Sequence, residues 1–182
     1  VRVRPHSKSH KCVEIARRQI ALGAFGICCQ KTSEAEPFLA GGIADVLISN
    51  EVVDGRKTLQ LAQLAARYPA AKVGVCVDDL HVVAQLARAC EQAHAMLDVY
   101  IELDVGHNRA GVTDVITVVA LGQAIAAHAP LSLRGLHAYF GNAQHRRSVA
   151  ERRQAIAAAT AAARSAKQAL VVAGLRCDVI TG

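Results

Sequence analysis

The sequence predicts an α/β fold, an incomplete (β/α)8 TIM-type barrel with about seven parallel strands. Short apolar runs alternate with helical segments along all 182 residues, and parallel strands need such crossover helices between them. A doubly wound open sheet has the same alternation. Eight barrel units take about 250 residues, however, so seven strands in a chain of this length favour a barrel that lacks its last unit.

The chain opens with a strand, a helix and a second strand. Residues 1–4 alternate between valine and arginine, as in a short strand. Residues 10–22 form a helix that Gly23 closes, and the apolar run 26–30 is too short for a helix and fits a buried strand.

Two more helix and strand pairs follow. Residues 32–42 begin with a cap and early acidic residues and end at two glycines, as a helix does, and residues 45–49 are an apolar strand. Residues 55–68 are helical up to Pro69, and residues 72–77 form the next strand.

The alternation of helices and strands continues to the end of the chain. Residues 79–94 place apolar side chains on one helix face, and the strand 98–104 follows. The remaining elements are a helix at 113–128, a strand at 131–139, a long alanine-rich helix at 146–174 with one possible break, and a strand at 177–181.

The composition describes one globular domain over residues 1–182, with no linker and with both ends cut. A net charge of +6 and a pI near 9.2 are compatible with nucleic-acid binding. Only 3% of residues are aromatic, however, and the basic residues are dispersed, so nucleic-acid binding is not expected. No membrane span or signal peptide is present. The cysteines lack C-x-x-C spacing and indicate reduced core residues of a cytoplasmic protein, with one reactive thiol left open; they are Cys12, Cys28, Cys29, Cys76, Cys90 and Cys177.

Polar residues follow the strands where a barrel would form its mouth. Asp78 and Asp79 also suit helix caps, and Asn50 suits a turn. The residues expected at the mouth are Lys8, Gln30, Lys31, Ser49, Asn50, Asp78, Asp79, Arg109, Tyr139, His145 and Thr181.

Three stretches suggest chemistry. Lys8 lies in a basic cluster that is either a solvated turn or the position of a desolvated, nucleophilic amine. Residues 104–111 form a glycine-flanked loop, in which Asp104 either orients Arg109 or forms a buried salt bridge with it. Residues 135–145 present a tyrosine and a histidine suited to proton transfer, and His137 on the same strand face is alternatively a core histidine.

Five stretches together resemble D-threonine aldolase and its relatives among the fold-type III pyridoxal phosphate (PLP) enzymes, which include alanine racemase and eukaryotic-type D-serine dehydratase. The resemblance covers nearly the whole chain in order. The stretches are PHSKSHK at 5–11, GICCQKTSEAE at 26–36, GVCVDD at 74–79, DVGHNRAG at 104–111, and Ala138-Tyr139 with Gln144-His145.

The resemblance implies a role for each candidate residue. Lys8 would form the Schiff base with PLP, Arg109 would contact the cofactor ring, and Tyr139 would line the pocket. His145 would be the base on the substrate β-hydroxyl, and Gln30 would reach the ring or the substrate. The remaining cofactor-binding residues would be the first two of a glycine-rich phosphate loop, Thr181 and Gly182.

The implied function is a lyase that cleaves D-β-hydroxy-α-amino acids to glycine and an aldehyde. His107 and Asn108 stand where small residues are usual in the aldolases, which puts the substrate in question. A divalent metal (Mn, Mg or Zn) would be bound by a C-terminal β-domain that this chain lacks, so no metal ligand is expected here, and the full-length protein would be a homodimer. The alternatives are a D-serine dehydratase, a non-catalytic PLP-binding protein and a barrel enzyme that does not use PLP.

Overall fold

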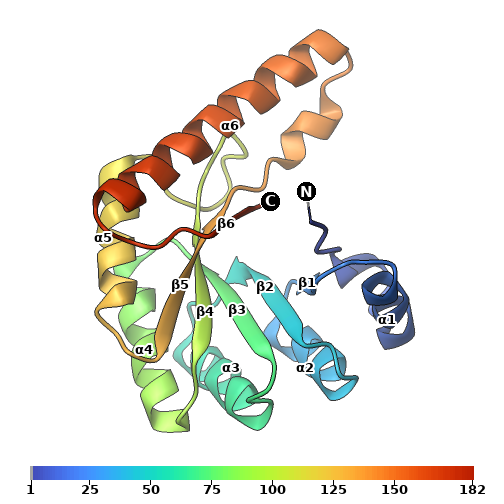
Figure 1. The fold of residues 1–182 in the computed structure, drawn as a ribbon, viewed down its shortest axis with the longest axis vertical. Helices are drawn as coiled ribbons and strands as arrows, with labels where there is room; N and C mark the ends of the chain where they lie inside the picture. Colours follow the sequence, from blue (N-terminus) through green and yellow to red (C-terminus); the bar gives the residue numbers. More distant parts are fainter. Residues whose placement is uncertain (1) are drawn as a thin grey trace.

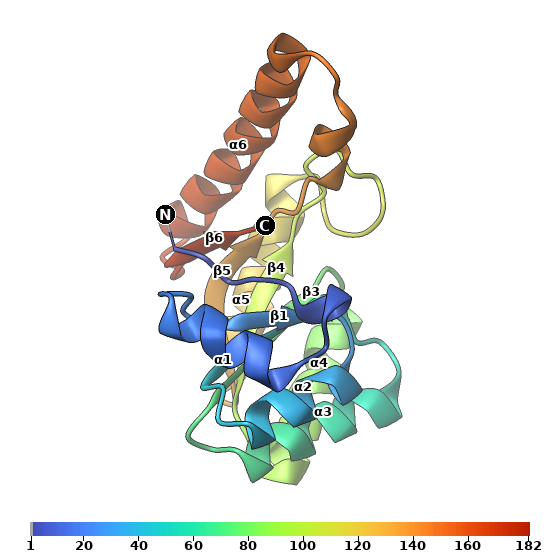
Figure 2. The same ribbon diagram turned by 90° about the vertical axis from the view of Figure 1, so that its right-hand side faces the viewer.

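A computed structural model describes residues 2–182. Its strands form one parallel six-stranded sheet in the order β1-β2-β3-β4-β5-β6, which curls into a half-barrel with helices on its outer side (Figures 1 and 2). The strands are β1 (Ile27–Cys29), β2 (Asp45–Glu51), β3 (Lys72–Val77), β4 (Leu97–Glu102), β5 (Leu131–His137) and β6 (Val179–Thr181).

All six predicted helices are present, with ends that differ by a few residues from the prediction. Asp54, Asp79 and Asp114 each cap a helix through their carboxylates. The last helix is unbroken, and Ser148 and Glu151 form a capping box at its start. The helices are α1 (Val13–Ala21), α2 (Thr32–Ala40), α3 (Gly55–Arg67), α4 (Leu80–Ala93), α5 (Val115–Ala126) and α6 (Val149–Val172), with 3-10 turns η1 (Ser7–Ser9) and η2 (Gly141–His145).

The strand predicted at residues 1–4 is the main correction to the fold. Val1 lies outside the described residues, and residues 2–4 form no strand. The segment still runs beside β1, because Phe25 N–H donates to the Val3 carbonyl and Cys28 N–H donates to the Pro5 carbonyl. Pro5 has no N–H to return to a ladder, which leaves only an isolated bridge between His6 and Cys28. The described sheet therefore has six strands, not seven.

Two hydrophobic clusters lie on the two faces of the curled sheet. The larger one packs the outer face of the strands against the helices. The smaller one lies inside the half-barrel and consists of Cys28, Leu47, Cys76 and Tyr100. Residues two further along these strands lie on the same inner face, since side chains alternate along a strand.

Strand β5 contains a bulge that decides which of its residues face inward. Val99 on β4 pairs with Leu133, but Tyr100 pairs with Gly135, so Arg134 is the extra residue. Gly135 is required there: its φ is +150°, and a Cβ atom would lie 1.9 Å from the Val179 carbonyl oxygen. Beyond the bulge, Leu136 faces the helices and His137 faces the interior beside Glu102.

All six cysteines are unpaired, and five of them are buried. Burial raises the pKa of the Cys28 thiol to about 11 and that of the Cys90 thiol to about 12. The expected core position is confirmed for these five cysteines, whereas Cys12 is half-buried. Among residues 2–182, no helix combines the length and the apolar character that crossing a membrane requires.

Candidate active site

A cavity of about 200 Å³ lies at the carboxyl ends of the strands. This is the end where a barrel of this type places its active site. Its lining includes eight residues expected at the mouth or in the phosphate loop, namely Lys8, Gln30, Ser49, Asn50, Arg109, Tyr139, Thr181 and Gly182. The other four lining residues are Arg4, His6, Cys28 and His137.

Four predicted mouth residues do not line this cavity. Lys31 is exposed just before α2. Asp79 caps α4 as expected, whereas Asp78 is not a cap: it accepts a hydrogen bond from the Gly111 N–H at 2.9 Å. His145 is exposed on η2, outside the cavity lining, so its role as a base stays a prediction. Asn50 does line the cavity, but it lies within β2 and not in the turn that the sequence suggested.

Lys8 is carried on the turn η1, which His6 holds in place. The Lys8 N–H donates to His6 Nδ1 at 3.1 Å, so the ring proton of neutral His6 lies on Nε2. His6 Nε2 then donates to the Ser49 hydroxyl at 3.1 Å, and this hydroxyl donates to the Cys29 carbonyl. Burial, and next the positive charge of Lys8, lower the pKa of His6 and favour the neutral ring.

The other lysine of the basic cluster is engaged elsewhere. Lys11 forms a 3.0 Å ion pair with Glu34, whose carboxylate also accepts the Gln30 N–H. Within residues 2–182, Lys8 forms no ion pair, and it faces the cavity. Lys8 is thus the lysine that can react with a ligand in the cavity.

The loop that carries Arg109 is shaped by two aspartates. Asp104 accepts hydrogen bonds from the Gly106 and Asn108 N–H groups, and Asp78 accepts one from Gly111. Burial acts to raise the Asp104 pKa, but the backbone donors outweigh it and the pKa is lowered. Gly111 has a φ of +98°, and a Cβ atom there would lie 2.6 Å from Asp104 N. Asp104 therefore forms no salt bridge with Arg109 in the described residues and instead fixes the loop backbone.

Tyr139 is held between neighbours at the cavity wall. The Arg109 guanidinium lies 5.6 Å from the centre of its ring, and the His107 ring meets it edge-on with centroids 5.2 Å apart. Gly141 leaves room for the phenol, because a Cβ atom there would lie 2.5 Å from the Tyr139 hydroxyl oxygen. This packing fixes an aromatic face beside the cation of Arg109.

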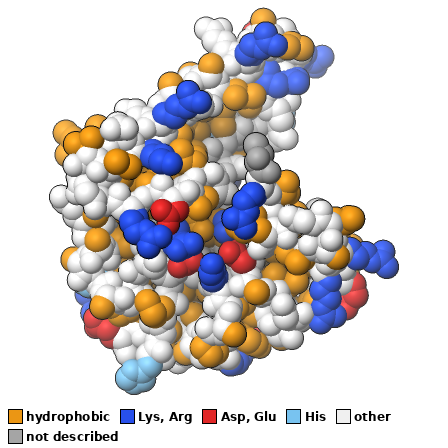
Figure 3. All heavy atoms as spheres, viewed as in Figure 1, with side chains coloured by type: hydrophobic (Ala, Val, Ile, Leu, Met, Phe, Trp, Pro, Cys, Tyr) orange, Lys and Arg blue, Asp and Glu red, His pale blue; other side chains and the backbone are white. Residues whose placement is uncertain are grey.

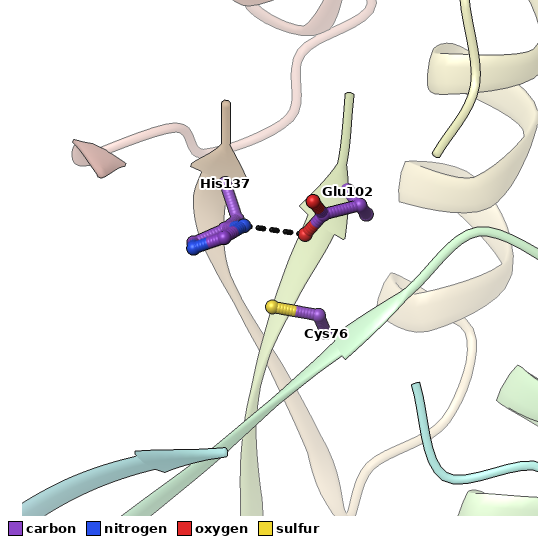
Figure 4. Close-up of side chains that lie close together, drawn as sticks. All are labelled: Cys76, Glu102 and His137. Carbon is purple, nitrogen blue, oxygen red and sulfur yellow. Dashed lines mark hydrogen bonds and ion pairs between the residues drawn. The ribbon is translucent and has the colours of Figure 1, made fainter. Parts of the chain in front are cut away.

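Sequence reasoning missed a buried cluster of Cys76, Glu102 and His137 (Figure 4). Their ligand atoms lie within 4.8 Å of one another, and Glu102 Oε2 lies 2.5 Å from His137 Nδ1. The prediction named no metal ligand in this chain, yet these three side chains are of types that bind metals. No distinct signal in the sequence marked Glu102, because Asp98 is a second acidic residue in the same strand and the pairing with His137 depends on the register of β5.

The cavity has the charge of an anion site. Among the described residues, its lining contains the cations Arg4, Lys8 and Arg109 and no acidic side chain. The Arg4 side chain is buried and pairs with Asp45 through Nη2, but its Nε and Nη1 atoms have no hydrogen-bond partner among residues 2–182. A phosphorylated aldehyde fits this donor set, because the Lys8 amine can bind its carbonyl carbon, and the Arg109 charge and the free Arg4 N–H groups can bind its anionic group.

A second, larger cavity of about 630 Å³ has mixed charges, and among the described residues its one lysine, Lys72, lies at the amino end of β3, away from the mouth. Arg4 and Asp45, which line it, form an ion pair, and Arg134 pairs with Asp98. Figure 3 shows basic and acidic side chains intermixed near the middle of one face of the molecule. Since these charges largely compensate one another, the first cavity is the candidate site.

Comparison with known proteins places the chain in a family. The family model for the alanine racemase N-terminal domain matches residues 1–179. The chain belongs to the alanine racemase N-terminal domain family. Proteins that resemble the chain include D-threonine aldolase from Arthrobacter sp., which is 50% identical over all of this chain and 47% of its own length.

The other relatives include one more aldolase and a dehydratase. The crystal structure of D-threonine aldolase from Filomicrobium marinum superposes with a TM-score of 0.93 at 46% identity, over 99% of this chain and 48% of that one. D-threo-3-hydroxyaspartate dehydratase from Delftia sp. (strain HT23) is 31% identical over all of this chain and 47% of its own length. The incomplete-barrel fold is confirmed, and the chain spans about half the length of these relatives.

Proposed function

We propose that residues 1–182 are the PLP-binding barrel domain of an aldolase that cleaves D-β-hydroxy-α-amino acids to glycine and an aldehyde. The observation that carries this proposal is the position of Lys8, which faces an anion-binding cavity beside Arg109 and Tyr139. The 50% identity to D-threonine aldolase supports the reaction class.

Each residue has a proposed task. PLP, when bound, supplies the electron sink for the carbanion formed when the Cα–Cβ bond breaks. Lys8 holds the cofactor covalently, and Arg109 and Tyr139 orient it. Gln30, Thr181 and Gly182 contact the cofactor at the rim of the cavity, where Thr181 and Gly182 precede the expected phosphate loop. His145 takes the proton of the substrate β-hydroxyl.

The full-length protein would add parts that this chain does not contain. We expect a divalent metal held by residues of a C-terminal domain, a homodimeric assembly and a cytoplasmic location. The metal would polarise the substrate hydroxyl and so assist the proton transfer to His145.

The Lys8 assignment is tested by borohydride reduction of the PLP-loaded protein followed by peptide mapping. We expect one pyridoxyl group on Lys8 and its loss in Lys8→Ala. Lys11→Ala is the matched control and should keep the modification, because Lys11 is paired with Glu34. A pyridoxyl group on another lysine, or none at all, contradicts the proposal.

A second candidate function is a dehydratase, and the 31% identity to D-threo-3-hydroxyaspartate dehydratase favours it. The two reactions give different products. Glycine and an aldehyde from D-threonine support the aldolase, whereas a keto acid and ammonia support the dehydratase. In the full-length, metal-loaded protein, a modified Lys8 with no product from either reaction would indicate a non-catalytic PLP-binding protein.

A further inference from the structure

Glu102 and His137 form a buried pair under the cavity. Glu102 is 3% exposed and His137 is 6% exposed, and the bulge at Arg134 brings them side by side on β4 and β5. Without this bulge, Leu136 would be the neighbour of Glu102. A bulge that re-aims one side chain next to a cavity is typical of functional sites.

The hydrogen bond to Glu102 gives the two imidazole nitrogens of His137 different roles. His137 Nδ1 lies 2.5 Å from Glu102 Oε2 and carries the proton of that bond. No protein group in residues 2–182 bonds Nε2, and His137 lines the cavity. Nε2 is thus the atom of this pair that a bound ligand can reach.

Among the groups around Glu102, the imidazole of His137 is the nearest one that can compensate the charge of the carboxylate. Burial, and next the charge of Glu102, raise the pKa of the Cys76 thiol well above its usual range, so Cys76 stays neutral. A buried carboxylate needs a hydrogen-bonded, positively polarised partner, and His137 supplies it at the shortest distance.

We propose that His137 is a ligand-contacting residue on the floor of the cofactor cavity, and that Glu102 is the positioning residue that holds its ring. This inference rests on the proposed function, because the ligand in question is PLP. Nε2 would contact the part of the cofactor beside Tyr139, which follows His137 by two residues just past the end of β5.

A metal site is the competing explanation for the cluster. Zinc lies about 2.0–2.2 Å from nitrogen and oxygen ligands, so two ligands of one tetrahedral ion lie about 3.4 Å apart, whereas Nδ1 and Oε2 lie at the hydrogen-bonding distance of 2.5 Å. The geometry therefore favours a carboxylate–imidazole pair over an ion bound between Nδ1 and Oε2.

The first experiment measures the ¹⁵N chemical shifts of the histidine rings with and without PLP. We expect His137 to carry its proton on Nδ1 and its Nε2 resonance to move when PLP binds. An unmoved Nε2 resonance in a protein whose Lys8 is modified by PLP overturns this inference alone. The absence of a Lys8 adduct overturns the proposed function and this inference with it.

The second experiment compares PLP affinity in variants. His137→Gln and Glu102→Gln should each weaken PLP binding about tenfold, the value of one hydrogen bond involving a charged group. The double variant should lose no more than either single variant, because both act through one contact. His81→Gln, at an exposed position on α4, should bind PLP normally.

Three results would count against the pair. Unchanged PLP affinity in folded His137→Gln overturns the contact, and additive losses in the double variant overturn the positioning role of Glu102. One equivalent of zinc that co-purifies with the protein and is lost in Cys76→Ser would replace the pair with a metal site.

Discussion

At the residue scale, His6 connects the lysine turn to the sheet. Its Nδ1 accepts the Lys8 N–H, and its Nε2 donates to Ser49, which in turn bonds the Cys29 carbonyl. Only the neutral ring can do both, since a protonated ring has no acceptor. The position of the Lys8 turn is thereby coupled to the charge of one histidine.

This coupling predicts a pH dependence of stability. The His6 pKa is lower in the folded protein than its ordinary value of 6.5. Above pH 6.5, His6 is neutral in both the folded and the unfolded protein, and its contribution to stability is complete. Below pH 6.5, His6 takes up a proton in the unfolded protein first, so the free energy of unfolding falls until the pH passes the pKa of His6 in the folded protein. The slope from this residue is at most about 1.4 kcal/mol per pH unit.

The test compares urea unfolding of the protein and of His6→Asn between pH 7.5 and 5. Asparagine keeps an acceptor for the Lys8 N–H but does not titrate. We expect a shallower loss of unfolding free energy in the variant as the pH falls. Parallel curves for the two proteins would show that His6 is not the titrating group.

At the element scale, the helices and most strands follow from the sequence, but register does not. Alternation and caps located all six helices and six strands, because these signals are local. The bulge at Arg134 depends on how β5 packs between β4 and β6, and no local signal except Gly135 marks it. The pairing of Glu102 with His137 was therefore beyond sequence reasoning, whereas mouth residues such as Lys8 and Arg109 were not.

The capping box of α6 offers a prediction about one element. The Ser148 hydroxyl accepts the Glu151 N–H at 3.1 Å, and the Glu151 carboxylate accepts the Ser148 N–H. Ser148→Ala should lower the free energy of unfolding by about 1 kcal/mol. Ser165→Ala is the matched control on the same helix, at an exposed interior position, and it should be neutral or slightly stabilising. Equal effects of the two substitutions in urea unfolding would contradict the role of the cap.

At the scale of the whole molecule, Arg4 ties the leading segment to the inside of the half-barrel. Its guanidinium reaches Asp45 on β2 at 2.9 Å and the Tyr100 hydroxyl on β4 at 3.2 Å, and it stacks on the Phe25 ring. The segment lacks a strand ladder, so these side-chain contacts replace backbone hydrogen bonds in fixing it. The sequence predicted a strand at residues 1–4, but an arginine directed into the interior has no local signature.

This arrangement predicts a large effect of breaking the ion pair. The Arg4 side chain is 4% exposed, and Asp45→Asn would leave its charge buried without a counter-ion. Removing one partner of a buried pair costs about 3–5 kcal/mol of unfolding free energy. Glu36→Gln, which breaks the exposed Arg67–Glu36 pair, is the control and should cost less than about 1 kcal/mol. If urea unfolding gives the same loss for both variants, the leading segment is held by its backbone contacts to β1 and not by Arg4.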